Sequence, residues 1–213
     1  MQVIKWLKPE NAYIFRIVHL ENVQWMLGNG IHCQNSAIKD PNYREIGNPD
    51  LIAKRDLKRI PIQPAGLLSD YIPFYFTPYT PMLYNIKTGI GVPQVPNSEI
   101  AILFTSLHKL IELGVQFLFT DCHAYLQMAE FFSNLEDLHK LDWERWQTRN
   151  FKRSSDDFGF ERYQAEALIY RHLPVTALWG IICYNDEQTL RLRREVQEQG
   201  LTVKIIMKPD WYF

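Results

Sequence analysis

The residue that most constrains this chain is Glu166, a carboxylate inside a run of strand-like residues. Residues 162–170 read Arg-Tyr-Gln-Ala-Glu-Ala-Leu-Ile-Tyr, and from Ala165 onward the pattern is typical of a partly buried strand. An ionised carboxylate is costly to bury unless its charge is neutralised or used. The local pattern leaves two interpretations open: Glu166 lies at the rim of a sheet and reaches water, or it is catalytic.

The remaining periodicity predicts a single domain, residues 1–213, of the α+β class. The chain is long enough to bury a full core, and no linker-like stretch divides it. Further strands are predicted at residues 13–19, 72–76, 100–105, 116–120, 175–184 and 202–207. Helices are predicted at residues 20–27, 106–113, 124–140 and 187–200. Strands and helices mixed without a regular βαβ repeat favour α+β.

Two other segments are predicted to be irregular. Residues 35–60 are polar and contain Pro41 and Pro49 as breakers; a connection this long usually carries a function, although its basic residues also fit a solvated helix face. Pro78 and Pro81 predict a second irregular segment directly after the strand at 72–76. The aromatic rings around that strand fit either stacking on a nicotinamide or nucleobase, or packing in the core.

Residues 142–160 contain cations interleaved with aromatic rings. Single-stranded nucleic acid needs this combination, because cations follow the phosphates and rings stack on bases. The formal net charge of -1 gives no global argument for nucleic acid, so the prediction depends on local clustering. The candidate DNA-binding residues of this segment are Arg145, Trp146, Arg149, Lys152 and Arg153.

Composition narrows the compartment and the chemistry. Three widely spaced cysteines fit reduced thiols better than a disulfide framework. Residues 1–10 do not resemble a signal sequence, and no stretch reaches membrane-spanning length, so a cytoplasmic protein is expected. No glycine-rich phosphate loop, His-Glu-x-x-His motif or paired-aspartate cluster is present, so neither a metal site nor a standard dinucleotide fingerprint is predicted.

Several motifs in order along the chain resemble the DarT family of DNA ADP-ribosyltransferase toxins. The resemblance covers nearly the whole sequence. It is carried by Arg-Ile-Val-His-Leu-Glu-Asn at 16–22, Lys-Arg at 54–55 with Arg-Ile-Pro at 59–61, Asp-Tyr-Ile-Pro-Phe-Tyr-Phe at 70–76, Thr-Pro-Met-Leu-Tyr at 80–84, Phe-Thr-Asp-Cys-His at 119–123, Gln-Ala-Glu at 164–166 and Lys-Pro-Asp-Trp-Tyr at 208–212.

The resemblance implies an ADP-ribosyltransferase fold, with a split mixed and antiparallel sheet, flanking helices and a central NAD cleft. It also implies transfer of ADP-ribose from NAD to a thymine ring nitrogen in single-stranded DNA, with release of nicotinamide and without a metal. The family acts as the toxin of a toxin–antitoxin pair, and its partner is a macrodomain antitoxin, DarG, that reverses the mark.

By position, the resemblance assigns catalytic roles to Glu166 and Arg55. Arg55 keeps its charge, so two roles stay open for it: relaying a proton, or stabilising the thymine anion and the NAD phosphates. His123 is a further catalytic candidate for orienting the substrate or shuttling a proton, with a core or surface histidine as the alternative.

The resemblance also divides the polar segments between the two substrates. Residues 41–55 resemble the element that covers the cofactor, and residues 123–166 resemble the substrate-recognising loop. Arg16 stands where a related member has a histidine. The expected NAD contacts are Arg16, Ile17, Val18, Trp25, Cys33, Arg55, Tyr75 and Met82.

The sequence leaves competing functions open. One is an ADP-ribosyltransferase that acts on RNA or protein, or an NAD glycohydrolase. Another is a non-catalytic module that binds single-stranded nucleic acid through the interleaved rings and cations. A metal-dependent nuclease is disfavoured because the sequence lacks a carboxylate cluster.

Overall fold

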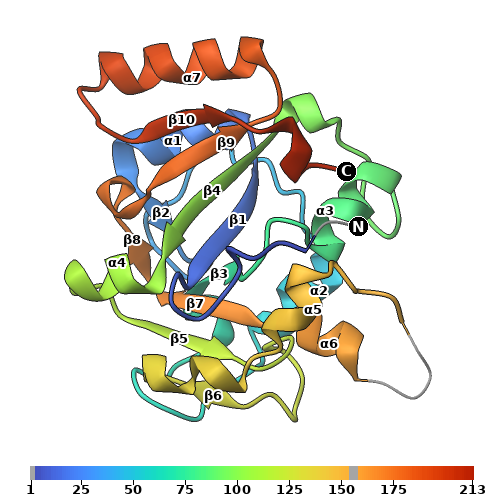
Figure 1. The fold of residues 1–213 in the computed structure, drawn as a ribbon. Helices are drawn as coiled ribbons and strands as arrows, with labels where there is room; N and C mark the ends of the chain where they lie inside the picture. Colours follow the sequence, from blue (N-terminus) through green and yellow to red (C-terminus); the bar gives the residue numbers. More distant parts are fainter. Residues whose placement is uncertain (1–2, 154–157) are drawn as a thin grey trace.

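The computed structural model describes residues 3–153 and 158–213, which form a mixed sheet flanked by helices (Figure 1). Residues 1–2 of the N-terminal stretch and residues 154–157 of the predicted DNA-binding segment lie outside the described residues. The sheet has eight strands in the order β10-β9-β4-β1-β3-β7-β5-β6. Their bounds are β1 Tyr13–His19, β3 Tyr71–Tyr75, β4 Ile100–Ser106, β5 Phe117–Thr120, β6 Phe131–Phe132, β7 Glu166–Tyr170, β9 Gly180–Cys183 and β10 Lys204–Met207.

The pairing makes the sheet mixed. β9 and β10 are parallel, and the other neighbours are antiparallel. A second sheet consists of two short strands, β2 (Ile31–His32) and β8 (His172–Leu173). The α+β class and the mixed sheet predicted from the sequence are confirmed.

The large sheet is split between β1 and β3. In the described part of the chain these strands pair at a single position, Phe15 opposite Tyr75, whereas β1 pairs with β4 from end to end. Pro73 explains the gap. Its carbonyl accepts a hydrogen bond from Nη1 of Arg16 at 2.9 Å, and the N–H and C=O of one strand residue point the same way. The missing N–H of Pro73 therefore faces β1, where it interrupts the ladder.

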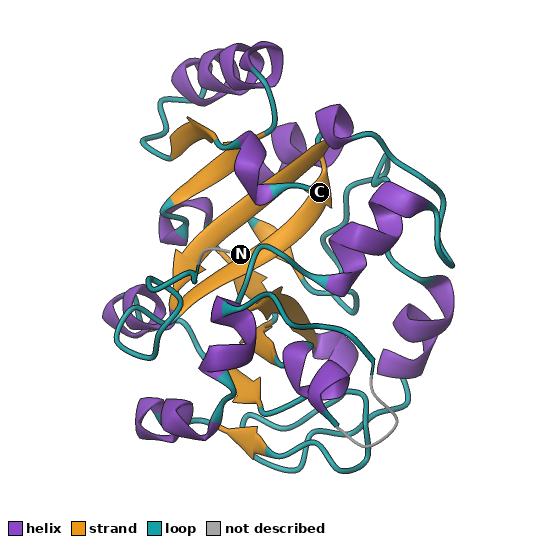
Figure 2. Cartoon of the chain, turned by 45° about the vertical axis from the view of Figure 1, so that its right-hand side comes forward, coloured by secondary structure: helices purple, strands orange, loops and turns teal. Residues whose placement is uncertain are grey.

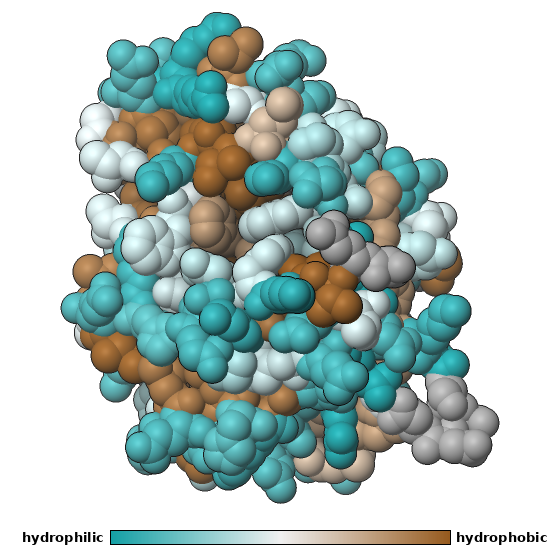
Figure 3. All heavy atoms as spheres, in the orientation of Figure 1, coloured by the Kyte–Doolittle hydropathy of each residue, from teal (hydrophilic) through white to brown (hydrophobic). Residues whose placement is uncertain are grey.

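Helices flank both sides of the sheet, as Figure 2 shows. Their bounds are α1 Glu21–Asn29, α2 Pro49–Arg55, α3 Pro81–Thr88, α4 Leu107–Glu112, α5 Trp143–Gln147, α6 Gly159–Tyr163 and α7 Asp186–Glu198. The 3-10 helices span Leu68–Asp70, Asn97–Glu99, Leu135–Lys140, Val175–Ala177 and Pro209–Trp211. On the face in Figure 3, hydrophilic residues cover α7, and hydrophobic residues show beneath it over the strands.

Aromatic side chains supply much of the core. Phe76 and Trp146 are fully buried and stack with ring centroids 5.1 Å apart, and the Trp146 indole donates to the carbonyl of Tyr163 at 2.9 Å. Burying a large apolar side chain stabilises a fold by about 1.5–3 kcal/mol. This packing fixes α5 and α6 against the chain that follows β3.

Most of the predicted elements are present, but the helix predicted at 124–140 is wrong. Phe131 and Phe132 instead form the edge strand β6, whose Phe132 lies opposite Phe119 of β5. Asn134 then accepts from the backbone of Glu136 and begins a 3-10 helix. Sheet pairing therefore overrides the helical spacing of the leucines. The predicted strand at 175–184 is also shorter than expected, because its first residues form a 3-10 helix.

Two segments predicted to be irregular contain helices. Asn48 caps α2 by accepting from the backbone of Asp50 and Leu51, and Thr80 caps α3 by accepting from that of Leu83. Proline follows each cap, at the first position of the helix. Proline is favoured at that position because the missing N–H would have no partner inside the helix. The prolines treated as breakers, Pro49 and Pro81, are therefore helix starts.

Candidate active site

Glu166 is buried at the first position of β7. Its side chain is 1% exposed, so the interpretation as a water-facing rim residue is wrong. Glu166 lies opposite Tyr75 of β3. Its backbone N–H donates to Oγ1 of Thr120 at 3.1 Å, and the same hydroxyl donates to the carbonyl of Cys122 at 2.6 Å. Thr120 thereby joins the start of β7 to the turn after β5.

Three donors hold the carboxylate. Nη1 of Arg55 lies 2.8 Å from Oε2, while Nδ1 of His123 and the backbone N–H of Ala124 lie 3.0 Å and 3.1 Å from Oε1. Burial by itself raises the pKa of Glu166, but the charges and hydrogen bonds of Arg55 and His123 outweigh it and lower the pKa to about 2. The carboxylate is therefore ionised at neutral pH.

Arg55 and His123 reach the carboxylate from separate segments. Arg55 ends α2, and its Nη2 also donates to the carbonyl of Leu68 at 3.4 Å. His123 follows β5, and its backbone N–H donates to the carbonyl of Glu161 at 3.0 Å. A carboxylate can only accept, so Nδ1 of His123, which faces it, carries a proton. In the neutral imidazole Nε2 is then the acceptor.

A cleft of about 440 Å³ opens beside these residues. Arg55 and His123 line it, as do most of the expected NAD contacts: Arg16, Ile17, Trp25, Cys33, Tyr75 and Met82. Val18 is the exception, because its side chain is 1% exposed and packs in the core. Burial, together with the charge of Glu166, raises the pKa of Tyr75, so its hydroxyl stays neutral. The cleft therefore combines apolar walls with a few polar groups, as small-molecule sites do.

Arg16 carries a hydrogen-bond donor without a partner at this cleft. Its Nε is buried and has no hydrogen-bond partner among the described residues. A buried donor without an acceptor costs free energy of folding, and an acceptor on a bound molecule removes that cost. An anionic or carbonyl-bearing ligand fits this position, and the phosphates and carboxamide of NAD supply such acceptors.

The segment before α2 covers one side of the cleft, where Tyr43, Glu45, Ile46 and Gly47 are among the lining residues. The buried side chain of Asn22 in α1 fixes this segment at residue 44. Its Nδ2 donates to the carbonyl of Arg44 at 2.9 Å, and its Oδ1 accepts from the N–H of Arg44 at 2.8 Å. The two bonds hold the covering segment as a neighbouring strand would.

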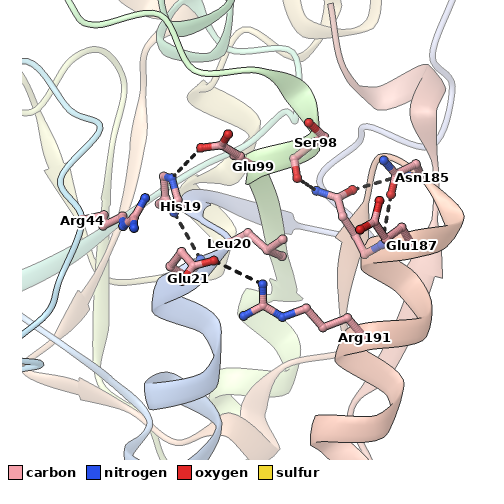
Figure 4. Close-up of a pocket in the computed structure, with 10 residues that line it drawn as sticks. His19, Leu20, Glu21, Arg44, Ser98, Glu99, Asn185, Glu187 and Arg191 are labelled. Carbon is pink, nitrogen blue, oxygen red and sulfur yellow. Dashed lines mark hydrogen bonds and ion pairs between the residues drawn. The ribbon is translucent and has the colours of Figure 1, made fainter.

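A second, polar hollow of about 370 Å³ lies on the other side of Arg44, between α1 and α7 (Figure 4). Its charged groups largely bind one another: His19 pairs with Glu99 at 3.2 Å, and Glu21 with Arg191 at 3.2 Å. The side chain of Arg44 lines this hollow, while the neighbouring Tyr43 and Glu45 line the cleft. Residue 44 therefore belongs to a wall that the two cavities share.

The predicted DNA-binding residues do not lie together on one open surface. Trp146 is fully buried and presents no face to a base, which corrects its expected role. The guanidinium of Arg149 lies 3.5 Å from the ring centroid of Tyr79, and Nε of Arg145 pairs with Asp142 at 3.1 Å. Lys152 and Arg153 are exposed.

Two absences hold for residues 3–153 and 158–213. No group of three or more histidine, cysteine, aspartate or glutamate residues is placed to hold a metal ion. No helix in this part of the chain has the length and apolar character needed to cross a membrane.

Sequence reasoning missed Thr120, Asn22 and the backbone N–H of Ala124. Thr120 begins the Thr-Asp-Cys-His motif and Ala124 directly follows it. The spacing of this motif signals a tight turn but not the carboxylate that it faces. Asn22 is a polar residue in the predicted helix at 20–27. Its role could not be predicted because the sequence does not show that its side chain is buried. Each acts through a contact more than 20 positions away in the sequence.

The fold and the site together define the class. A split mixed sheet with a cleft along it, and a buried glutamate paired with arginine beside the cleft, are the features of an NAD-dependent ADP-ribosyltransferase. The family model for "ssDNA thymidine ADP-ribosyltransferase, DarT" matches residues 15–213. The chain therefore belongs to the DarT family, and it is an enzyme that modifies thymidine in single-stranded DNA with ADP-ribose from NAD.

Relatives and solved structures agree with this assignment. A DNA ADP-ribosyl transferase of Escherichia coli O127:H6 is 46% identical over 209 residues, which cover 97% of this chain and 96% of the relative. A DNA ADP-ribosyl transferase of Thermus sp. (strain 2.9) is 32% identical, over 96% of this chain and 98% of the relative. The Thermus sp. 2.9 DarT structure in complex with ADP-ribosylated ssDNA has a TM-score of 0.88 and 30% identity, over 96% of this chain and 98% of that chain. The structure of Thermus sp. 2.9 DarT in complex with NAD+ has a TM-score of 0.83 and 30% identity, over 96% of this chain and 99% of that chain.

Proposed function

We propose that Glu166, Arg55 and His123 carry out the transfer of ADP-ribose from NAD to a thymine ring nitrogen in single-stranded DNA. The observation that carries the proposal is the buried Glu166 carboxylate, which is held by Arg55 and His123 beside the cleft. Both donors line the cleft, so the carboxylate that they hold lies next to the space for substrates.

Glu166 acts on the donor substrate. Breaking the bond between nicotinamide and ribose gives the sugar oxocarbenium character, and nicotinamide leaves with the bonding electron pair. The ionised carboxylate stabilises the developing positive charge and accepts a hydrogen bond from a ribose hydroxyl. Because the carboxylate is fixed before the reaction, this stabilisation costs no reorganisation. Arg16, Trp25, Cys33, Tyr75 and Met82 hold the NAD in the cleft.

His123 and Arg55 act on the acceptor. The thymine nitrogen is a poor nucleophile until its proton leaves. Nδ1 of His123 donates to Glu166 at 3.0 Å, which leaves Nε2 to take that proton, while the charged guanidinium of Arg55 stabilises the thymine anion. The nitrogen then bonds to the ribose carbon, and the proton passes to solvent.

The acceptor is a single strand. In a duplex the same ring nitrogen is engaged in base pairing, so the enzyme would have to extrude the base before reaching it. DNA labelling is therefore expected with single-stranded oligonucleotides and not with the fully paired duplex.

The family resemblance supports a wider role. The protein acts as a toxin in the cytoplasm, and its partner is a macrodomain antitoxin of the DarG type that removes the ADP-ribose. Three free, buried cysteines fit a reducing compartment. Expression of the wild-type chain should arrest growth, and co-expression of a macrodomain hydrolase should restore it.

The direct test uses Glu166→Gln, which keeps the shape of the side chain and removes its charge. Thymine oligonucleotides are incubated with NAD and analysed by mass spectrometry. The transfer rate of the variant should fall by at least ~100-fold, which is the effect of removing one electrostatic contact to the transition state. Glu99→Gln is the matched control, because Glu99 also pairs with a histidine, His19, but outside the cleft.

Each outcome decides something. A Glu166→Gln variant that keeps most of its activity contradicts the catalytic assignment. Labelling of RNA or protein in place of DNA, or consumption of NAD without labelling, would reassign the acceptor. His123→Ala should bind NAD normally, transfer slowly and recover in part with added imidazole; no loss of rate would exclude His123 as the base.

A further inference from the structure

We propose that Tyr125 and Lys54 form a DNA subsite at the mouth of the cleft. The Tyr125 ring stacks on the base next to the reacting thymine, and the Lys54 ammonium binds the adjoining phosphate. The inference rests on the proposed function, because it places the acceptor strand relative to Glu166.

The first argument is the position of Tyr125. Its ring centroid lies 5.4 Å from that of His123, with the two rings at 86°. His123 in turn lies 3.0 Å from Glu166. His123 lines the cleft, whereas Tyr125 is not among the lining residues. Tyr125 is therefore one side chain away from the reaction centre and outside the space for NAD, where a base next to the reacting thymine would lie.

The second argument is that the ring is held in place but not enclosed. Tyr125 is half-buried and packs against a small apolar cluster that is separate from the main core. The cluster consists of Ile60, Leu68, Tyr71, Leu118, Ala124 and Leu168. A ring supported on one side gives a base a fixed surface to stack on, and the stacking requires little further ordering of the side chain.

The third argument is the cation that covers the ring. Nζ of Lys54 lies 5.1 Å from the Tyr125 ring centroid, and Lys54 has no ion pair within the described ranges. The exposed Lys54 side chain has four carbons and can move. A base that stacks on the ring can take the place of the ammonium, which then reaches the phosphate of the same strand. Rings and cations in alternation are what single strands require.

The fourth argument is that the two segments are tied together. Nζ of Lys58 donates to the carbonyl of Leu126 at 2.8 Å and lies 6.0 Å from the Phe131 ring centroid. Lys58 follows α2, which carries both Lys54 and the active-site Arg55. The stacking ring, the phosphate-binding cation and Arg55 are therefore positioned by the same pair of segments. This surface supplies the aromatic contact that the buried Trp146 cannot.

The test compares Tyr125→Leu, Tyr125→Phe and Lys54→Gln. Leucine keeps apolar packing without a ring, and phenylalanine keeps the ring. KM and kcat are measured with a thymine oligonucleotide at saturating NAD, and DNA affinity is measured across a salt series. Lys109→Gln and Trp179→Leu are matched controls, because Nζ of Lys109 lies 4.6 Å from the Trp179 ring centroid in an equivalent pair that does not line the cleft.

Tyr125→Leu should raise the KM for DNA by about 5- to 150-fold, the effect of losing one stacked base, and Tyr125→Phe should stay within about twofold of wild type. Lys54→Gln should reduce the slope of log affinity against log salt by about 0.7, the value for one phosphate contact on a single strand. The affinity for NAD should not change in any of these variants.

Three results would overturn the subsite. The first is an unchanged KM for DNA in Tyr125→Leu, and the second is an equal rise of that KM in the two control variants. The third is a loss of NAD affinity parallel to the loss of DNA affinity, which would indicate a structural role. Failure of the proposed function itself would look different, because the wild-type protein would then not label DNA at all.

Discussion

At the residue scale, the charge of Glu166 results from two opposing effects. Burial disfavours the carboxylate and raises its pKa, whereas Arg55 and His123 favour it and together lower the pKa to about 2. The ordinary value is 4.5. Since the folded-state pKa lies below the unfolded one, ionisation of Glu166 stabilises the fold above pH 4.5. This contribution is lost as the pH falls toward 2.

This linkage predicts how stability depends on pH. Between pH 5 and pH 2.5 the wild-type protein should lose free energy of unfolding relative to Glu166→Gln, by on the order of 2 kcal/mol, because only the wild type has a carboxylate at this position that takes up a proton on unfolding. Urea denaturation of both proteins at several pH values measures the difference. Parallel curves for the two proteins over this range would show that the Glu166 pKa is not lowered by folding.

Individual site residues could be predicted from the sequence unequally well. Glu166 was singled out because a carboxylate in an apolar strand is unusual, and Arg55 and His123 because their motifs match a family. The structure brings all three together. Trp146 was misplaced because rings that stack on bases and rings that stack on Phe76 have the same local sequence signature. Only the folded chain distinguishes them.

At the element scale, α2 has little packing of its own. None of its residues is buried. It depends on the Asn48 cap at its beginning and on the bond between Arg55 and Glu166 at its end. Most helices in proteins are stabilised by an apolar face packed on the core. Here Leu51 and Ile52 line the cleft instead, so a substrate bound in the cleft would supply the surface that the core does not.

The covering segment that leads into α2 gives a second prediction. Asn22→Asp replaces the Nδ2 donor to Arg44 with an oxygen, which repels the Arg44 carbonyl. Loss of one buried hydrogen bond should raise the KM for NAD by about tenfold. kcat should change less than about threefold, because Arg55 is held separately by Glu166. Steady-state kinetics with varied NAD at saturating oligonucleotide measure both constants.

Asn97→Asp is the control for this prediction. The side chain of Asn97 also donates to a backbone carbonyl, that of Phe213, at 2.9 Å, and it does not line the cleft. Two results would exclude the hydrogen bonds between Asn22 and Arg44 as a determinant of NAD binding. One is a rise in the KM for NAD of similar size in both variants, and the other is a loss confined to kcat in Asn22→Asp.

Elements were predictable where one local signal dominated. β1 and α7 follow their periodicity, and their predicted bounds are close to those observed. α3 was not predicted, and in residues 35–60 a solvated helix was only an alternative to an irregular connection. Asn48-Pro49 and Thr80-Pro81 nevertheless carry the cap and first-turn signature of a helix start. β6 had no such signal: two residues become a strand only because β5 lies beside them.

At the scale of the whole molecule, the cleft lies along the split in the sheet. Arg16 and Ile17 come from β1, and Tyr75 comes from β3. A molecule that fills the cleft would contact both sides of the split as well as the covering segment. The family resemblance predicted this split sheet and its NAD cleft, because a shared order of motifs carries tertiary information that periodicity does not. Periodicity alone gave only the α+β class.

Bound NAD should therefore stabilise the entire domain. At 100 times its dissociation constant, a ligand that binds only the folded state adds about 2.7 kcal/mol, which corresponds to a rise in Tm of about 5–10 °C for a domain of this size. Differential scanning fluorimetry without DNA measures the shift. Trp25→Ala, in the cleft, should reduce it, and Trp179→Ala, which does not line the cleft, should keep it. No shift in the wild type would argue against NAD in the cleft.

Pro73 determines whether ligand binding has to separate β1 from β3. Since its nitrogen carries no hydrogen, no movement of neighbouring side chains can complete the ladder between β1 and β3. A covalent property of one residue thus limits the pairing of β1 with β3 beyond Phe15 and Tyr75, whether or not a ligand is bound. The free energy of substrate association is accordingly not used to separate them. It is left for ordering the covering segment and for aligning the sugar with the carboxylate.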